Sequence, residues 1–104
     1  MTSLKPRGAR KENRVQVDLF DENGDSVKID IPKAEFQTRK RMKDLQQWIK
    51  DNSDSSVEDM MVHIIGTFSP EAEAFINEHE IEVSQLNELW DMYTDKKAEE
   101  VEGK

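Results

Sequence analysis

The sequence predicts an α+β fold that is mostly helical, with an N-terminal β-hairpin followed by about four helices. Over residues 14–31, apolar residues alternate with polar ones, which is typical of half-buried strands. From residue 33 onward, apolar residues recur at intervals of three and four, as they do along one face of a helix. Strands that precede a run of helices, instead of alternating with helices, indicate the α+β class.

Composition sets the size of the predicted domain. A chain of 104 residues, 37% charged and 35% hydrophobic, is expected to form one small domain with a thin core. We place that domain at residues 14–95, between a flexible basic arm (1–13) and a disordered tail (96–104), because both ends lack apolar periodicity. The chain has no cysteine, which excludes disulfides. Its apolar runs fall short of the roughly 20 residues of a membrane span, and we expect no signal peptide.

The hairpin is predicted to turn at Asn23 and Gly24, and the length of that turn decides its register. A two-residue turn would put the apolar residues of the two strands on opposite faces of the hairpin. A three-residue turn, Glu22–Asn23–Gly24, puts them on one face and needs Gly24 in a left-handed conformation. We therefore predict the longer turn, with Pro32 ending the second strand. The predicted cross-strand pairs are Leu19 with Val27, Val17 with Ile29, and Val15 with Ile31.

The acidic residues around this turn raise the possibility of a calcium loop. If Gly24 is the sixth position of an EF-hand loop, the first position is Leu19, whose side chain cannot bind a cation. We therefore interpret the acids as solvating the turn and expect no metal site. His63 and His79 are not at metal-ligand spacing from each other, and we interpret both as boundary residues of helices.

The helices are predicted over residues of about 33–51, 57–67, 70–79 and 84–95. The first has a basic polar side and ends in the loop sequence DNSDSS. The inner face of the last is predicted from its regularly spaced leucines and aromatic residues.

Capping residues define the ends of the two middle helices. Either Ser55, which has Glu58 at capping-box spacing, or Ser56 is expected to begin the second helix. That helix is expected to stop near Gly66. Ser69 can cap the third helix, and the next residue, a proline, suits its first turn.

The sequence contains no recognisable catalytic pattern. It has no Ser-His-acid order and no glycine-rich phosphate loop, and acidic pairs such as Glu71 and Glu73 do not share a helix face. We therefore expect a non-enzymatic protein without a cofactor. The basic stretch RKRMK invites a nucleic-acid interpretation, but residues 51–104 are strongly acidic and no aromatic residues are interleaved with the basic ones.

Two features suggest protein partners. A two-stranded hairpin is marginal in water, so it must dock on the helices or pair with another chain, and its open edges favour self-association. Methionine and aromatic side chains form either core or an adhesive groove, and Trp48 and Trp90 are the first candidates for such a surface.

Residues 40–93 resemble the tail assembly chaperones of long-tailed bacteriophages. The stretch VEDMMVHIIGTFSPEAEAF carries the resemblance, following a basic helix and an acidic linker. The resemblance implies a protein of the host bacterial cytoplasm, absent from the mature virion, that coats the tape measure protein and recruits tail tube subunits. A small head–tail adaptor, or an acidic regulator that binds a basic partner or nucleic acid, remains an alternative.

A chaperone of this kind would need an apolar groove with a charged rim to shield an amphipathic helix. The candidate groove residues are Met60, Met61, Ile64, Phe68, Leu89, Trp90 and Trp48. The candidate basic rim is formed by Arg39, Lys40, Arg41 and Lys43.

Overall fold

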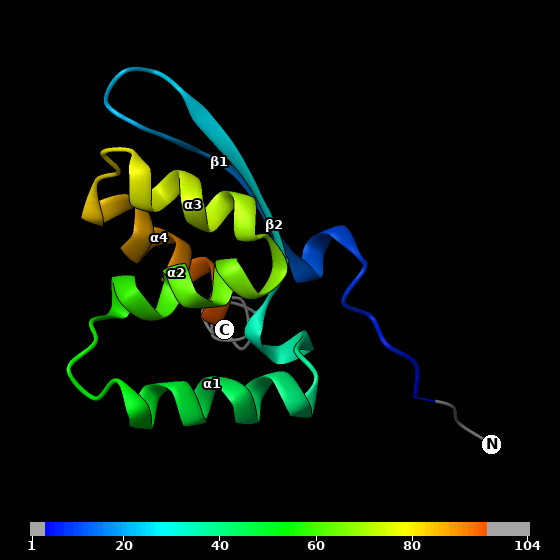
Figure 1. Cartoon of the computed structure of the whole chain (residues 1–104). Helices are drawn as coiled ribbons and strands as arrows, with labels where there is room; N and C mark the ends of the chain where they lie inside the picture. Colours follow the sequence, from blue (N-terminus) through cyan, green and yellow to red (C-terminus); the bar gives the residue numbers. More distant parts are fainter. Residues whose placement is uncertain (1–3, 96–104) are drawn as a thin grey trace, which may run out of the picture.

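The computed structural model describes residues 4–95 of the chain and has the predicted α+β class, a β-hairpin followed by four helices (Figure 1). The predicted tail, residues 96–104, lies outside the described residues. Short 3-10 turns precede the hairpin and the first helix. The elements are η1 (Lys11–Asn13), β1 (Arg14–Phe20), β2 (Ser26–Pro32), η2 (Ala34–Phe36), α1 (Arg39–Asp51), α2 (Val57–Phe68), α3 (Pro70–Glu78) and α4 (Val83–Thr94).

The hairpin has the predicted register. Leu19 lies opposite Val27 in an antiparallel pairing that runs the length of both strands. Gly24 has a φ of 93°. This conformation is strained for any residue that has a Cβ, whereas glycine adopts it at little energetic cost. The observed register confirms the prediction of a three-residue turn. It puts the apolar residues of both strands on one face of the hairpin.

The apolar face of the hairpin packs on three of the helices. α4 lies against β1, whereas α2 and α3 lie against β2 (Figure 1). Where these elements meet, the exposed fraction is 1% for Ile29, 0% for Met61 and 2% for Leu89. The hairpin is thus held in place by its own helices, which supply the partner that a two-stranded sheet needs.

The first predicted helix, over residues 33–51, begins too early. Residues 34–36 form the separate turn η2, and α1 starts only at Arg39. The reason is a cap: the Thr38 side-chain oxygen accepts the backbone N–H of Arg41 at 3.2 Å, and Thr38 itself has extended backbone angles. In Figure 1, α1 runs below the other elements, and Leu45 is its one buried residue.

The α2–α3 junction also differs in detail from the prediction. The capping box at the start of α2 joins Ser56 to Asp59, so Ser55 is not the cap. Gly66 lies inside α2 and does not end it; the helix continues to Phe68. Ser69 then leaves the helical conformation, and its side chain accepts the backbone N–H of Ala72 to begin α3, as predicted.

Candidate partner-binding groove

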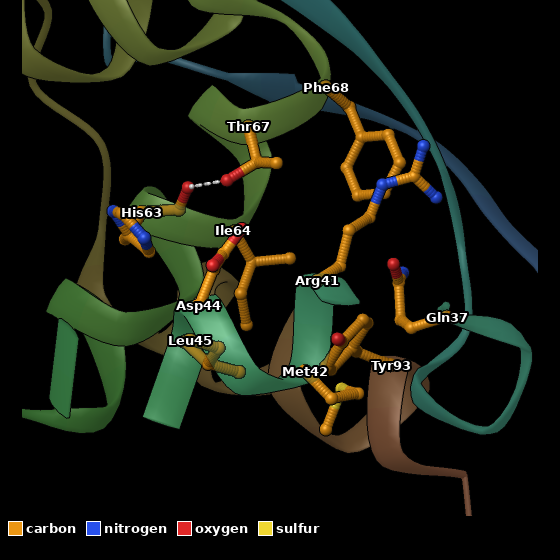
Figure 2. A pocket seen from close by; sticks show the side chains of 10 residues that line it. All are labelled: Gln37, Arg41, Met42, Asp44, Leu45, His63, Ile64, Thr67, Phe68 and Tyr93. Carbon is orange, nitrogen blue, oxygen red and sulfur yellow. Dashed lines mark hydrogen bonds between the residues drawn. The ribbon is translucent and has the colours of Figure 1, made fainter. Parts of the chain in front are cut away.

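An apolar groove of about 240 Å³ lies between α1 and α2 (Figure 2). Leu45 and Met42 of α1 face Ile64 and Phe68 of α2 across it, and Tyr93 of α4 lines it as well. Helical periodicity explains this meeting of side chains, because residues three or four apart project from one side of each helix. The remaining lining residues are polar: Gln37, Arg41, Asp44, His63 and Thr67.

Arg41 places a positive charge at this groove. Its guanidinium carbon lies 4.8 Å from the centre of the Phe68 ring, a cation–π arrangement visible in Figure 2. Arg39, Lys40 and Lys43, from the same stretch of α1, are exposed. Within residues 4–95, none of these four cations forms an ion pair with a carboxylate. The groove is therefore apolar inside and lined by one cation, Arg41, and one anion, Asp44, while the three other cations, which like Arg41 pair with no carboxylate among residues 4–95, lie on the same helix.

A ring stack continues the contact between α1 and α2 beyond the groove. Trp48 of α1 and His63 of α2 stack with ring centres 4.5 Å apart. His63 lines the groove on one side and, on the other, a polar hollow of about 570 Å³ whose lining includes Asp51, at the end of α1, and the linker residues 52–55. Trp48 lines that polar hollow and not the apolar groove.

Tyr93 shows how little water reaches one wall of the groove. Its exposed fraction is 2%, and burial raises the pKa of its phenol above the ordinary value of 10.0, because the charged form is poorly solvated there. The hydroxyl therefore stays neutral, and its side chain presents a mostly apolar surface.

The structure brings together part of the predicted partner-binding set. Ile64, Phe68 and Arg41 line the groove. Met61 and Leu89 lie in the core and are not available at the surface in this conformation. The other predicted residues, Met60, Trp90 and Trp48, are half-buried elsewhere.

Sequence reasoning missed several residues that line the groove. Met42 and Leu45 follow the apolar period of α1, and Tyr93 follows that of α4, so helical periodicity is the signal that assigns them to inner faces. Periodicity does not state which helix a given face will meet. That Tyr93 and Met42 line one groove is a tertiary result.

A second cluster ties the tip of the hairpin to α3. Asp21 Oδ1 accepts the backbone N–H groups of Asn23 and Asp25, each at 2.9 Å. Its other oxygen lies 2.6 Å from His79 Nδ1, and since an ionised carboxylate only accepts, the imidazole N–H donates. The His79 ring stacks on Phe75 of α3, with ring centres 3.9 Å apart. The sequence prediction of boundary residues included His79 but missed this link.

Asp21, Asp25 and His79 are also the one group of potential metal ligands found in the described part of the chain, with ligand atoms within 4.8 Å of one another. Both carboxylate oxygens of Asp21 accept hydrogen bonds. These hydrogen bonds hold the acidic turn of the hairpin in place. The hydrogen bond from His79 is the main reason why the pKa of Asp21 is lower than its ordinary value. These contacts are hydrogen bonds that connect the hairpin turn to the C-terminal end of α3.

Comparison of the chain with protein-family models, with curated proteins and with solved structures yields no match. Among the described residues, no helix has both the length and the apolar character that crossing a bilayer requires.

Proposed function

We propose that the protein binds an amphipathic helix of another protein in the groove between α1 and α2 and acts without catalysing a reaction. The observation that carries the proposal is an apolar groove beside cations of α1 that form no ion pair with the carboxylates of residues 4–95. Recognition of a helix in a groove uses a few apolar anchors spaced three, four and seven residues apart. The groove supplies the receiving side chains, and the cations select the charge of the flanking residues.

The size of the groove supports a protein ligand over a small molecule. Its volume of about 240 Å³ is below the range of roughly 300–1,000 Å³ that is usual for small-molecule sites. Such a groove accommodates anchoring side chains, and the remainder of a partner helix would lie along the surface of α1 and α2.

We further propose that the partner is the tape measure protein of a long-tailed bacteriophage, and that the protein is a tail assembly chaperone of the host cytoplasm that also recruits tail tube subunits. The resemblance of residues 40–93 to such chaperones supports this assignment. A tail assembly chaperone needs a groove that shields an amphipathic helix, because a long helical protein exposes its apolar side until it is assembled.

Co-expression tests this function. A tape measure protein produced with the chain should remain soluble and should co-purify with it, whereas alone it should aggregate. Arg41→Glu, which reverses the charge at the groove, should reduce co-purification. Lys50→Glu is the matched control, because it makes the same charge change on α1 at an exposed residue that does not line the groove.

Two outcomes would contradict the proposal. Equal loss of binding with Arg41→Glu and Lys50→Glu would mean that general charge, and not the groove, attracts the partner. Failure to bind the tape measure protein, together with DNA binding that weakens steeply with salt, would favour the nucleic-acid regulator instead.

A further inference from the structure

The two edges of the hairpin are not equivalent. On β1, the side-chain amide of Gln85 in α4 imitates a neighbouring strand: its Nε2 donates to the carbonyl of Phe20 at 2.9 Å, and its Oε1 accepts the Phe20 N–H at 3.3 Å. The edge of β1 is therefore closed at the end nearest the turn. Open edges are sites where another strand can pair, and proteins commonly block them.

These bonds also reveal which backbone groups of β2 face outward. Because the N–H and C=O of Phe20 point away from β2, the same is true of every second residue in the antiparallel pair. On β2 the outward residues are Ser26, Lys28, Asp30 and Pro32. The first three are exposed, whereas Pro32 is buried and its carbonyl accepts from the side-chain amide of Gln37 at 2.9 Å, so the edge is open only from Ser26 to Asp30. Within the described residues, the backbone groups of Ser26 and Lys28 have no protein partner, and the Asp30 carbonyl accepts only from Arg14, at 3.2 Å.

We propose that the open edge of β2 pairs antiparallel with the β2 edge of a second copy of this chain, giving a four-stranded sheet. Pairing centred on Ile29 puts Lys28 of each copy opposite Asp30 of the other, so two cross-strand ion pairs form together with four backbone hydrogen bonds between these residues. Within its own chain the Asp30 carboxylate accepts from Arg14 Nε at 2.7 Å through Oδ1, so the lysine of the second copy is its second cationic partner. Shifting the pairing by one step would place lysine opposite lysine or aspartate opposite aspartate. Charge complementarity therefore selects both the occupant and the register.

The acidic surface limits the strength of this dimer. Each copy carries a net charge of −8, and α3, which packs against β2, exposes Glu71 and Glu78. Two copies therefore repel each other at low ionic strength. We expect the dimer to tighten from low salt to about 0.15 M, where charges more than about 8 Å apart are largely screened. Within each Lys28–Asp30 ion pair of the sheet, the two charges are closer together than about 8 Å, so salt screens their attraction less.

Sedimentation of the full chain tests the proposal directly. The wild type should change from monomer to dimer between about 10 μM and 1 mM. Lys28→Pro removes an N–H that points outward, so it leaves the hydrogen bonds within the hairpin intact and should weaken the dimer at least about tenfold. Gln16→Pro is the matched control, because its N–H points outward from β1, on the other edge. Circular dichroism should show that both variants are folded.

Mixing two charge variants tests the register. Lys28→Glu puts glutamate opposite aspartate, and Asp30→Lys puts lysine opposite lysine, so each variant alone should dimerise about tenfold more weakly. An equimolar mixture should recover the association of the wild type, because both cross-strand pairs then join opposite charges. A wild type that stays monomeric at about 1 mM and 0.15 M salt, a dimer that survives Lys28→Pro, or a mixture that does not recover would each overturn the proposal.

Discussion

Leu45→Ala should loosen α1 without unfolding the rest of the protein. Leu45 is the one buried residue of α1, with an exposed fraction of 9%, and α1 packs less closely than α2 and α4. Segments with few buried contacts open locally at low free-energy cost. Alanine is as good a helix former as leucine, so the substitution acts on the docking of α1 and not on its helical tendency.

The expected size of the effect follows from the buried area. Burying a leucine side chain contributes about 1.5–3 kcal/mol, so its loss should raise the opening equilibrium of α1 about 10- to 100-fold. Amide hydrogen exchange measures this quantity residue by residue. Exchange should accelerate from Arg39 to Asp51 and stay unchanged in the hairpin.

Leu89→Ala provides the contrast. Leu89 lies in α4 with an exposed fraction of 2%, and removing a fully buried leucine usually costs about 2–5 kcal/mol of global stability. Its exchange effect should therefore spread over the hairpin and the helices packed on it. The reasoning would be refuted if Leu45→Ala accelerated exchange in α2 and α4 as much as in α1, because α1 would then belong to the common core.

Three further variants test local features. Gly24→Ala should lower stability by about 1–2 kcal/mol, because a side chain at a φ of 93° is strained although nothing lies within 4 Å of it; thermal unfolding should show a midpoint lower by several degrees, and an unchanged midpoint would exclude the strain. Gly66→Ala should stabilise by up to about 1 kcal/mol, since helix propensity improves and the new Cβ, 2.6 Å from Glu73 Oε1, meets only the end of a flexible side chain; a lower denaturant midpoint would show that Glu73 cannot move. The pKa of Asp21 is below its ordinary value because of His79, so this carboxylate stabilises the fold above its unfolded-state pKa, and the contribution is lost as pH falls through the lower folded-state pKa. Asp21→Asn should therefore be less stable near neutral pH and lose less stability than the wild type below about pH 4; parallel pH profiles of unfolding free energy would contradict this.

Local chemistry determined most of the element types from the sequence alone. The alternation of Val15, Val17 and Leu19 with their polar neighbours specified the strands, and the side-chain period of two then specified the register. Ser69 marked a helix start because its hydroxyl can satisfy a backbone N–H only a few residues away. The false start of α1 arose because the apolar pattern was extended back to residue 33, although Thr38 is the one Ser, Thr, Asp or Asn between residues 33 and 43 and therefore the capping residue.

Contacts between distant residues were decided only by the tertiary structure. Asp21 and His79 are 58 positions apart, and Phe20 and Gln85 are 65 apart. Nothing in the composition or the period of either partner specifies the other. The same holds for the groove: periodicity gave inward faces to Ile64 and Met61 alike, yet the first lines the groove and the second is fully covered by core. A helix period fixes the direction of a side chain relative to its own axis, whereas exposure depends on which other element lies in that direction.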